Sequence, residues 1–206
     1  MFAELLRAHL GGIELPEAQI EAFEAHYHLM VRWNKALNLT KITEMHEAIE
    51  RHYVESLFLG AHLPTGSWRI ADVGSGPGFP GFPVAVLRPE CQVTLIESHQ
   101  RKAVFLREAT RGMANVKVLA IRADKVEEKF DWVVSRAVSY DDLAVALPRL
   151  ALSAALLTGT EEPPSEWAYE WETAIAVPGG MARFLRIGRS LGKLGSEAQV
   201  PADGPK

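Results

Sequence analysis

A glycine-rich turn between two apolar segments constrains this chain more than any other feature. A short apolar run at residues 70–73 predicts a buried strand. The sequence GSGPGFPG follows at residues 74–81, and an apolar segment at residues 82–87 can then form a short helix. Glycines adopt positive φ and let a ligand lie against the backbone, because they have no Cβ. A strand, a glycine turn and a helix in this order predict the nucleotide-binding crossover of a doubly wound α/β sheet.

Two cofactors compete for this turn. The spacing Gly76-x-Gly78-x-x-Gly81 satisfies the dinucleotide fingerprint, which is weak when it stands alone. Asp72 at the strand end argues against a pyrophosphate, because a carboxylate repels an anion and attracts the ammonium and sulfonium groups of S-adenosylmethionine. The pattern Asp72-x-Gly74-x-Gly76-x-Gly78 therefore favours S-adenosylmethionine. A tight turn that binds no ligand is the alternative.

A second carboxylate ends the next predicted strand, at residues 92–96. Glu97 stands there and can accept hydrogen bonds from both ribose hydroxyls of an adenosine. A nicotinamide cofactor needs the same acid, so Glu97 indicates adenosine without choosing between the two cofactors. Its alternative use is to cap a helix that begins near Gln100.

The third predicted strand, at residues 116–121, adds two candidate cofactor contacts. Ala123 and Asp124 follow its carboxyl end. The aspartate can accept from an adenine amino group, and the alanine leaves room for the ring. A helix cap is an equally good interpretation of Asp124 on spacing alone.

The fourth predicted strand, at residues 130–134, is followed by Arg136 and, further along, by a predicted helix at residues 143–152. Ligands of open α/β sheets bind outside the carboxyl ends of the strands, so we expect this guanidinium to line the pocket. It can bind the cofactor, the target base or a phosphate. The alternative is a salt bridge to Glu97 or Asp131.

Apolar residues at helical spacing predict that residues 1–63 form a helical extension packed on the core, with a turn at residues 35–40 and one further helix from Ile49 onward. The asparagines beside Trp33 can cap helices or hold a base, and capping is the commoner use. Basic side chains outnumber acidic ones between residues 101 and 136, which indicates either a modest positive region or an ordinary charged helix face. The candidate RNA contacts in these segments are Asn34, Asn38, Arg51, His52, Arg101 and Lys102.

Composition limits the environment and the partners. A length of 206 residues suits one α/β domain with an appendage. The net charge of −4 argues against a strong general nucleic-acid binder, so a polyanionic partner must meet a local patch. The single cysteine, Cys91, fits a reducing compartment. No segment is typical of a signal peptide or a membrane span, so we expect a cytoplasmic protein, which we take to be a monomer.

The segment after the fourth strand limits which methyl acceptors are possible. Methylation of an adenine amino group predicts Asn-Pro-Pro-aromatic or Asp-Pro-Pro-aromatic there, and Ser135-Arg136-Ala137 stands in its place. No Pro-Cys pair supplies a thiol for pyrimidine C5 chemistry, and no Cys/His cluster has metal-ligand spacing in the sequence, so we expect no metal. Guanine N7 has an in-plane lone pair and no proton to lose. Such an acceptor needs alignment and a suitable field, and we expect no catalytic general base.

Several of these motifs together resemble the bacterial small-subunit rRNA guanine-N7 methyltransferases, the RsmG family, also called glucose-inhibited division protein B (GidB). The resemblance covers about residues 20–158. It rests on WNKALNLT at 33–40, RHYVESL at 51–57, DVGSGPGFPG at 72–81, ES at 97–98, RKAVFL at 101–106 and SRA at 135–137. It implies a Rossmann-like S-adenosylmethionine-dependent methyltransferase fold with a mostly parallel sheet, and a target guanine in 16S rRNA of the small ribosomal subunit. The cofactor contacts it implies are Gly74, Phe79, Ala123, Asp124 and Arg136.

The C-terminal part departs from the family pattern. The family usually has a Lys-Gly pair at the end of its fifth strand, predicted here at residues 154–158, and this chain has Thr158-Gly159. If that lysine contacts RNA, its absence affects substrate binding and leaves the cofactor site intact. Residues 177–178 and 183–187 still predict a closing strand pair. We predict a helical extension at 1–63, a methyltransferase domain at 64–195 and a disordered tail at 196–206.

Three other functions remain open on sequence alone. The acidic net charge favours a methyltransferase that acts on a small molecule. The missing lysine favours a non-catalytic ribosome-assembly factor that retains the cofactor pocket. The dinucleotide spacing leaves a nicotinamide oxidoreductase, which would bind NAD and have no affinity for S-adenosylhomocysteine.

Overall fold

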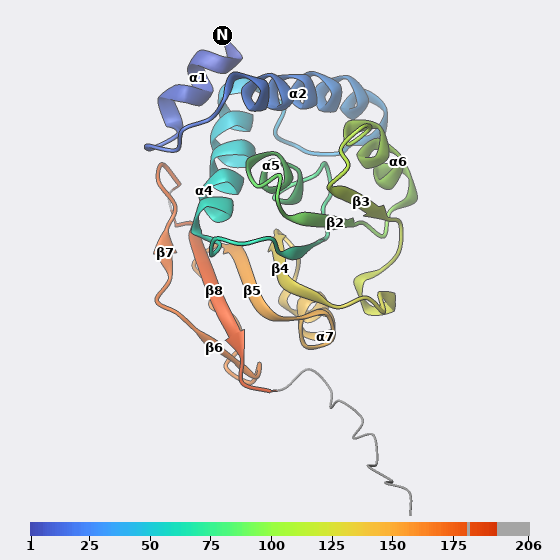
Figure 1. Ribbon diagram of the computed structural model, residues 1–206, viewed down its shortest axis with the longest axis vertical. Coiled ribbons are helices and arrows are strands. Elements are labelled where there is room, and N and C mark those ends of the chain that lie inside the picture. The colour runs from blue at the N-terminus through green and yellow to red at the C-terminus, as the bar shows by residue number, and fades with distance from the viewer. Residues whose placement is uncertain (181, 193–206) are drawn as a thin grey trace, which may run out of the picture.

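A computed structural model of the chain describes residues 1–180 and 182–192. Its centre is one sheet with the spatial strand order β3-β2-β1-β4-β5-β8-β6, and β7 pairs with β8 (Figure 1). Neighbouring strands from β3 to β5 are parallel, whereas β8 is antiparallel to β5, β6 and β7. The strands are β1 (Arg69–Val73), β2 (Gln92–Ile96), β3 (Val116–Leu119), β4 (Phe130–Arg136), β5 (Ala151–Thr158), β6 (Tyr169–Trp171), β7 (Ile175–Ala176) and β8 (Phe184–Ser190).

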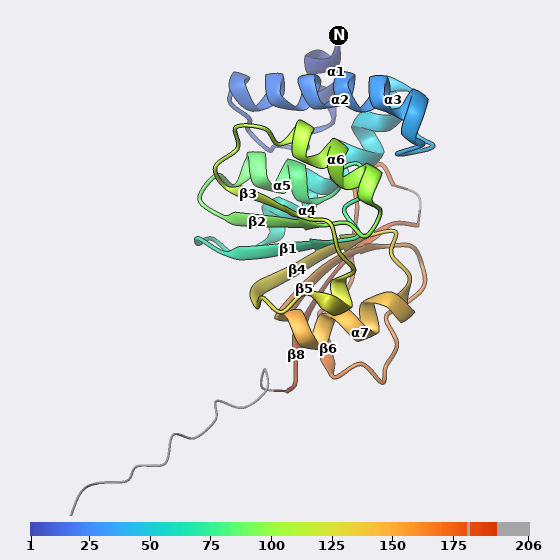
Figure 2. The ribbon, with the colours of Figure 1, turned by 90° about the vertical axis from the view of Figure 1, so that its right-hand side faces the viewer.

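Helices cover both faces of the sheet (Figure 2). Helices α4, α5 and α6 lie on one face with α2 outside them, and α7 lies on the opposite face. The helices are α1 (Phe2–His9), α2 (Glu17–Leu37), α3 (Met45–Ala48), η1 (Ile49–Val54), α4 (Glu55–His62), α5 (Gly81–Leu87), α6 (Gln100–Ala109), η2 (Ala123–Lys125) and α7 (Tyr140–Leu150). Among the described residues, no helix has both the length and the apolar character needed to cross a membrane. The predicted doubly wound arrangement is confirmed.

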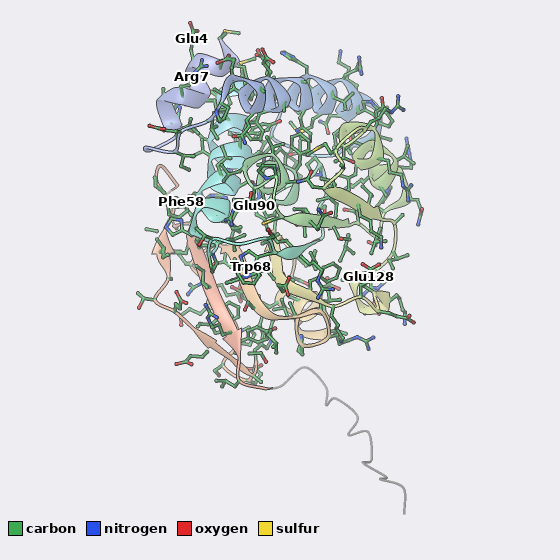
Figure 3. All side chains as sticks on the ribbon, in the orientation of Figure 1. Glu4, Arg7, Phe58, Trp68, Glu90 and Glu128 are labelled. Carbon is green, nitrogen blue, oxygen red and sulfur yellow. The ribbon has the colours of Figure 1, made fainter. Side chains whose placement is uncertain are left out.

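Successive residues of each strand pack on opposite faces, so the apolar core has two parts. Ile70 of β1 joins the larger cluster, which contains Phe23 of α2 and Phe82 of α5. Ala71 joins the smaller cluster, under Leu143 of α7. The larger cluster runs from the N-terminal helices into the sheet without a break, so these helices and the sheet share one core. Side chains fill the space between these helices and the sheet (Figure 3).

The N-terminal helices differ from the predicted ones in their bounds. Helix α2 continues to Leu37, into a segment predicted as a turn, and ends where Asn38 adopts left-handed φ and ψ of 49° and 52°. The single helix predicted from Ile49 onward is three consecutive elements, α3, the π-helix η1 and α4. A π-helical turn is rare and often lies at a functional site.

Three further bounds were wrong. Strand β3 ends at Leu119, two residues before the predicted end. Helix α7 begins at Tyr140 rather than at residue 143, because the Ser139 side chain caps it by accepting from the Asp142 N–H at 3.2 Å. Strand β5 begins at once after α7, and β6 was not predicted at all. The predicted closing pair is confirmed as β7 with β8, at slightly shifted positions.

The strand order reverses between β1 and β4, and this creates a crevice at their carboxyl ends. The Ser135 hydroxyl donates to the Val73 carbonyl at 2.8 Å and ties the two strand ends together. The predicted tail at 196–206 lies outside the described residues.

Candidate active site

The turn after β1 wraps tightly against β2 and against the segment that follows β4. The Gly74 and Ser75 N–H groups both donate to the Ile96 carbonyl, at 2.9 and 3.1 Å. Gly74 has φ of +74°, and a Cβ on it would lie 2.4 Å from Cγ2 of Val138. Both the conformation and the close approach therefore require glycine at this position.

Asp72 is completely buried beneath the same turn. Its Oδ2 accepts from the Gly81 N–H at 3.0 Å, at the first residue of α5. Its Oδ1 has no hydrogen-bond partner among the described residues. Burial raises the pKa of Asp72 to about 7, and hydrogen bonds to Ser75 and Gly81 oppose that rise. The predicted contact with a cofactor ammonium stays a prediction, and the structure adds that Asp72 fixes the start of α5.

Glu97 at the end of β2 joins two loops. Its Oε2 accepts from the Gly76 N–H at 2.9 Å and its Oε1 from the His99 N–H at 2.7 Å. The N-cap of α6 is His99, so Glu97 supports the helix start from two positions further back. Each carboxylate oxygen has a second lone pair, so Glu97 can still accept a ribose hydroxyl.

A cavity of about 360 Å³ lies beside these loops, and we call it the β2–β3 cavity. Three predicted cofactor residues, Gly74, Ala123 and Asp124, line it together. The Asp124 carboxylate lies 3.1 Å from Arg122 Nε, and it does not cap η2, whose N-cap is Arg122. Glu97 lies between two lining residues without lining the cavity itself, and Gly76, Gly78 and Phe79 also lie outside the lining.

A second cavity of about 520 Å³ lies at the ends of β4 and β5, and we call it the β4–β5 cavity. The two cavities share residues 137–139, which form the wall between them. Ala137 in this wall has φ of +57°, a conformation that non-glycine residues seldom adopt and that concentrates at functional sites. The charged residues that line the second cavity are Arg51, Glu55, Arg136, Glu161 and Arg183, and its polar residues include Tyr140 and Thr158.

Arg136 is the central side chain of the β4–β5 cavity, and 13% of it is exposed. Its guanidinium donates to the Arg51 carbonyl in η1 and to Nδ1 of His52, the latter at 2.8 Å. It also lies 3.6 Å from a carboxylate oxygen of Glu55. Arg136 lines this cavity and does not line the β2–β3 cavity, so its contact with the cofactor stays a prediction. Its carboxylate partner is Glu55, not the alternative partners Glu97 or Asp131.

Glu55 connects Arg136 to the C-terminal strands. Its carboxylate lies 3.0 Å from a guanidinium nitrogen of Arg183, between β7 and β8, and only 4% of the side chain is exposed. Burial raises the pKa of Glu55 to about 7, and Arg136 and Arg51 oppose that rise. A carboxylate between two arginines holds both guanidinium groups at the cavity.

Buried aromatic rings pack around His52, the residue that accepts from Arg136. His52 stacks on Phe79 with ring centroids 4.4 Å apart, and Phe79 is 3% exposed, so its side chain belongs to the core. His26 bridges the Tyr53 hydroxyl at 2.7 Å and the Pro77 carbonyl at 3.0 Å. Burial lowers the pKa of His26 to about 3 and that of His52 to about 2, so both rings are neutral at physiological pH.

The candidate RNA residues separate into two groups. The Asn34 side chain accepts from the Thr40 N–H at 2.9 Å and donates to the Thr40 carbonyl at 3.0 Å. Asn38 ends α2, so both asparagines shape the loop after that helix. His52 is buried and supports Arg136. The more accessible candidates are Arg51, which lines the β4–β5 cavity, and Arg101 and Lys102 on α6. Their contact with RNA stays a prediction.

Sequence reasoning missed Glu55, Arg183 and Arg186 as parts of the site. Glu55 lies in the RHYVESL motif three residues after His52, which was the available signal. The two arginines come from the β7–β8 region, whose place beside β5 depends on antiparallel pairing. Arg186 Nε donates to the Thr158 hydroxyl at 3.0 Å, and its aliphatic stem is buried with the rest of the side chain.

Comparison with known families gives one consistent result. The family model described as GidB, rRNA small subunit methyltransferase G, matches residues 19–153. A protein named ribosomal RNA small subunit methyltransferase G from Chromobacterium violaceum is 36% identical over 175 residues, which are 83% of this chain and 81% of that protein. A protein of the same name from Xylella fastidiosa is 41% identical over 133 residues, 63% of this chain and 62% of that protein.

Comparison with solved structures agrees at the level of the fold. A SAM-dependent methyltransferase from Aquifex aeolicus has a TM-score of 0.53 and 17% identity, over 69% of this chain and 91% of that one. A predicted O-methyltransferase from Agrobacterium tumefaciens has a TM-score of 0.55 and 22% identity, over 67% and 81% of the respective chains. These likenesses show the Rossmann-like methyltransferase fold.

Proposed function

This chain belongs to the GidB family of rRNA small subunit methyltransferases G, and from that membership we propose that it methylates N7 of a guanine in 16S rRNA of the small ribosomal subunit. S-adenosylmethionine supplies the methyl group when it is bound. The observation that carries the proposal is the pair of adjoining cavities at the β1–β4 switch point, divided only by residues 137–139. Two adjoining cavities can hold a methyl donor and a methyl acceptor next to each other, at the place where ligands of such sheets bind.

The residues present suit S-adenosylmethionine. A Cβ added to Gly76 would have only the Gly74 carbonyl nearby, at 3.9 Å, so the backbone there is open to a ligand. Asp72 offers an unpartnered buried acceptor, and Glu97 and Asp124 offer carboxylates near the β2–β3 cavity. This concentration of acidic groups favours a cationic cofactor over the pyrophosphate of NAD.

The chemistry asked of the protein is alignment. Guanine N7 attacks through its own lone pair and releases no proton, so no side chain has to act as a general base. His26 and His52 are buried and neutral, which suits a supporting role. The Arg51 carbonyl and His52 Nδ1 accept from Arg136 and hold its guanidinium in place at the β4–β5 cavity. A guanidinium held in this way can orient a base or a carboxylate, because its N–H groups lie in one plane. We assign Arg136 to that positioning.

The positive charge for RNA lies at the β4–β5 cavity. Arg51, Arg136 and Arg183 line it, although the whole chain has a net charge of −4. Arg186 lies against Thr158, at the strand end where the family carries a lysine. We propose that Arg183 and Arg186 supply the charge that this lysine gives elsewhere, and that Arg51, Arg101 and Lys102 extend the RNA contact. The reaction then takes place in the cytoplasm with a monomeric enzyme that needs no metal for methyl transfer.

Thr158 also favours a second candidate function, a ribosome-assembly factor that kept the pocket and lost activity. The two functions differ in a single-turnover experiment. Excess enzyme with methyl-labelled S-adenosylmethionine is mixed with small subunits from cells that lack this gene. We expect about one methyl group per subunit, recovered as N7-methylguanine in 16S rRNA. Binding of the subunit without any methyl transfer would identify the assembly factor instead.

A further inference from the structure

Two histidines and a glutamate from three helices converge where the N-terminal helices meet, and none of the three lines either cavity. His9 ends α1, His46 lies in α3 and Glu50 lies in η1. One ligand atom from each lies within 4.8 Å of the others. His9 Nε2 is 3.2 Å from Glu50 Oε1, and His46 Nδ1 is 3.6 Å from Glu50 Oε2. The two imidazole rings stand edge to face, with centroids 5.1 Å apart.

The hydrogen bonding of His9 determines which of its nitrogens is free. His9 Nδ1 lies 2.8 Å from the Leu5 carbonyl, which can only accept, so Nδ1 carries the proton of the neutral ring. Nε2 therefore presents a lone pair to the Glu50 carboxylate at 3.2 Å. Two electron-pair donors at this distance repel each other unless a cation lies between them. An outer hydrogen bond from Nδ1–H to a carbonyl is also the arrangement that orients metal-binding histidines.

We propose that His9, His46 and Glu50 bind a first-row divalent transition metal, of which Zn²⁺ is the appropriate probe. Neutral imidazole and carboxylate are ordinary ligands for Zn²⁺, and a set of two histidines and one glutamate leaves one position to solvent. The cluster has access to solvent, because the side chains of His9, His46 and Glu50 are 29%, 52% and 39% exposed. The rival cation is a proton, which would make His9 and Glu50 an ordinary ion pair.

A metal here would fasten α1 to the α3–η1 segment. Helix α1 lies at the edge of the molecule, where Glu4 and Arg7 project outward (Figure 3). His9 is the last residue of that helix and Glu50 lies in the π-helix that also contains Arg51 and His52. The site therefore joins the first helix of the chain to the element that supports Arg136.

The test uses full-length protein without a histidine tag, freed of metal by a chelator. Calorimetry should show one Zn²⁺ bound per chain, and the melting temperature should rise with Zn²⁺ concentration. Loss of a residue that only hydrogen-bonds to a metal ligand costs about 10–100-fold in metal affinity, and loss of a ligand should cost more. Each of His9→Gln, His46→Gln and Glu50→Gln should therefore lower the affinity for Zn²⁺ by at least about 100-fold. Co²⁺ in place of Zn²⁺ should give a visible absorption band that His9→Gln removes.

The matched control is His28→Gln. His28 pairs with Glu24 at 3.8 Å with the same four-residue spacing as His46 and Glu50, and among the described residues no third ligand joins that pair. This variant should bind Zn²⁺ as tightly as the unaltered protein. Circular dichroism without metal verifies that each variant is folded. If Zn²⁺ does not bind, or if the three ligand variants bind it as tightly as His28→Gln, the cation between His9 and Glu50 is a proton and the proposal is wrong.

Discussion

The guanidinium of Arg136 donates a hydrogen bond to Nδ1 of His52 at 2.8 Å, although the two residues lie 84 positions apart. Arginine stays protonated, so Nδ1 must accept and the remaining ring proton belongs on Nε2, where the Thr40 hydroxyl is 3.1 Å away. The helical extension therefore determines where the arginine at the end of β4 points. This connection makes the N-terminal helices part of the site.

Arg136→Lys should slow methyl transfer to small subunits by about 10–100-fold, because lysine keeps the charge and loses the fork that spans His52 and the Arg51 carbonyl. Single-turnover rates measure this loss. A higher cofactor Kd with unchanged subunit binding would indicate a cofactor contact, and the reverse would indicate RNA. Arg69→Lys, at an exposed pair with Asp131, is the control and should be silent. Full activity and both affinities retained in Arg136→Lys and Arg136→Ala would make the residue structural.

Asp72→Asn should weaken S-adenosylmethionine binding by about 1–3 kcal/mol, the range for loss of a charged hydrogen-bond partner. The asparagine side-chain oxygen can still accept from the Gly81 N–H, so the turn should survive. Calorimetry with cofactor gives the affinity, and NAD should show no binding to either protein. Unchanged cofactor affinity in the variant would show that Asp72 serves only the start of α5.

Gly81→Ala should destabilise the fold by about 1–3 kcal/mol, the cost of forcing an extra group into a packed core. Its Cβ would lie 2.4 Å from Leu95 Cδ2 and 2.6 Å from Asp72 Oδ2. Gly159→Ala is the matched control for stability, because nothing lies within 4 Å of its Cβ position. Urea unfolding of the two variants gives the comparison, and equal stabilities would contradict the close approach of Asp72 to α5.

His26→Gln should cost less stability in acid than at neutral pH. The pKa of His26 is lowered from 6.5 to about 3, so above pH 6.5 neither the folded nor the unfolded state holds its proton. Below that pH the unfolded chain takes up a proton that the folded ring refuses, and stability falls by about 1.4 kcal/mol per pH unit.

The His26→Gln variant lacks this loss of stability in acid, because it has no imidazole at that position. The difference in unfolding free energy between the two proteins should therefore shrink by about 2–3 kcal/mol between pH 6.5 and 4.5. Comparing two proteins removes the opposing titration of Asp72 and Glu55, which is common to both. Urea unfolding at the two pH values measures it. A difference that does not vary with pH would mean that His26 is protonated in the folded protein.

The local features that the sequence predicted correctly depend on short-range patterns. The strand and glycine turn at residues 69–81 follow from apolar periodicity and glycine placement, and parallel strands bring their carboxyl ends to one edge. Of the residues that this reasoning named as cofactor contacts, Gly74, Ala123 and Asp124 line one cavity, and their contact with the cofactor stays a prediction. Arg136 lines the other cavity.

The features that it did not predict depend on tertiary packing. Glu55 pairs with Arg136 and also with Arg183, which lies 128 positions further along the chain, and no periodicity encodes such pairings. The cluster of His9, His46 and Glu50 likewise forms only when α1 packs against η1, so a search for ligand spacing along the chain could not find it. Helix α2 extended past its predicted end because Asn38 supplied a left-handed cap that looks like any turn residue.

Methylation of 16S rRNA by this protein is tested directly by mapping N7-methylguanine in 16S rRNA from cells with and without this gene. Chain cleavage specific to N7-methylguanine, read by primer extension, locates each such base. We expect one site to vanish when the gene is deleted, to return with the unaltered gene and to stay absent with Arg136→Ala. An identical pattern of N7-methylguanine in the deleted and unaltered cells would contradict methylation of 16S rRNA by this protein.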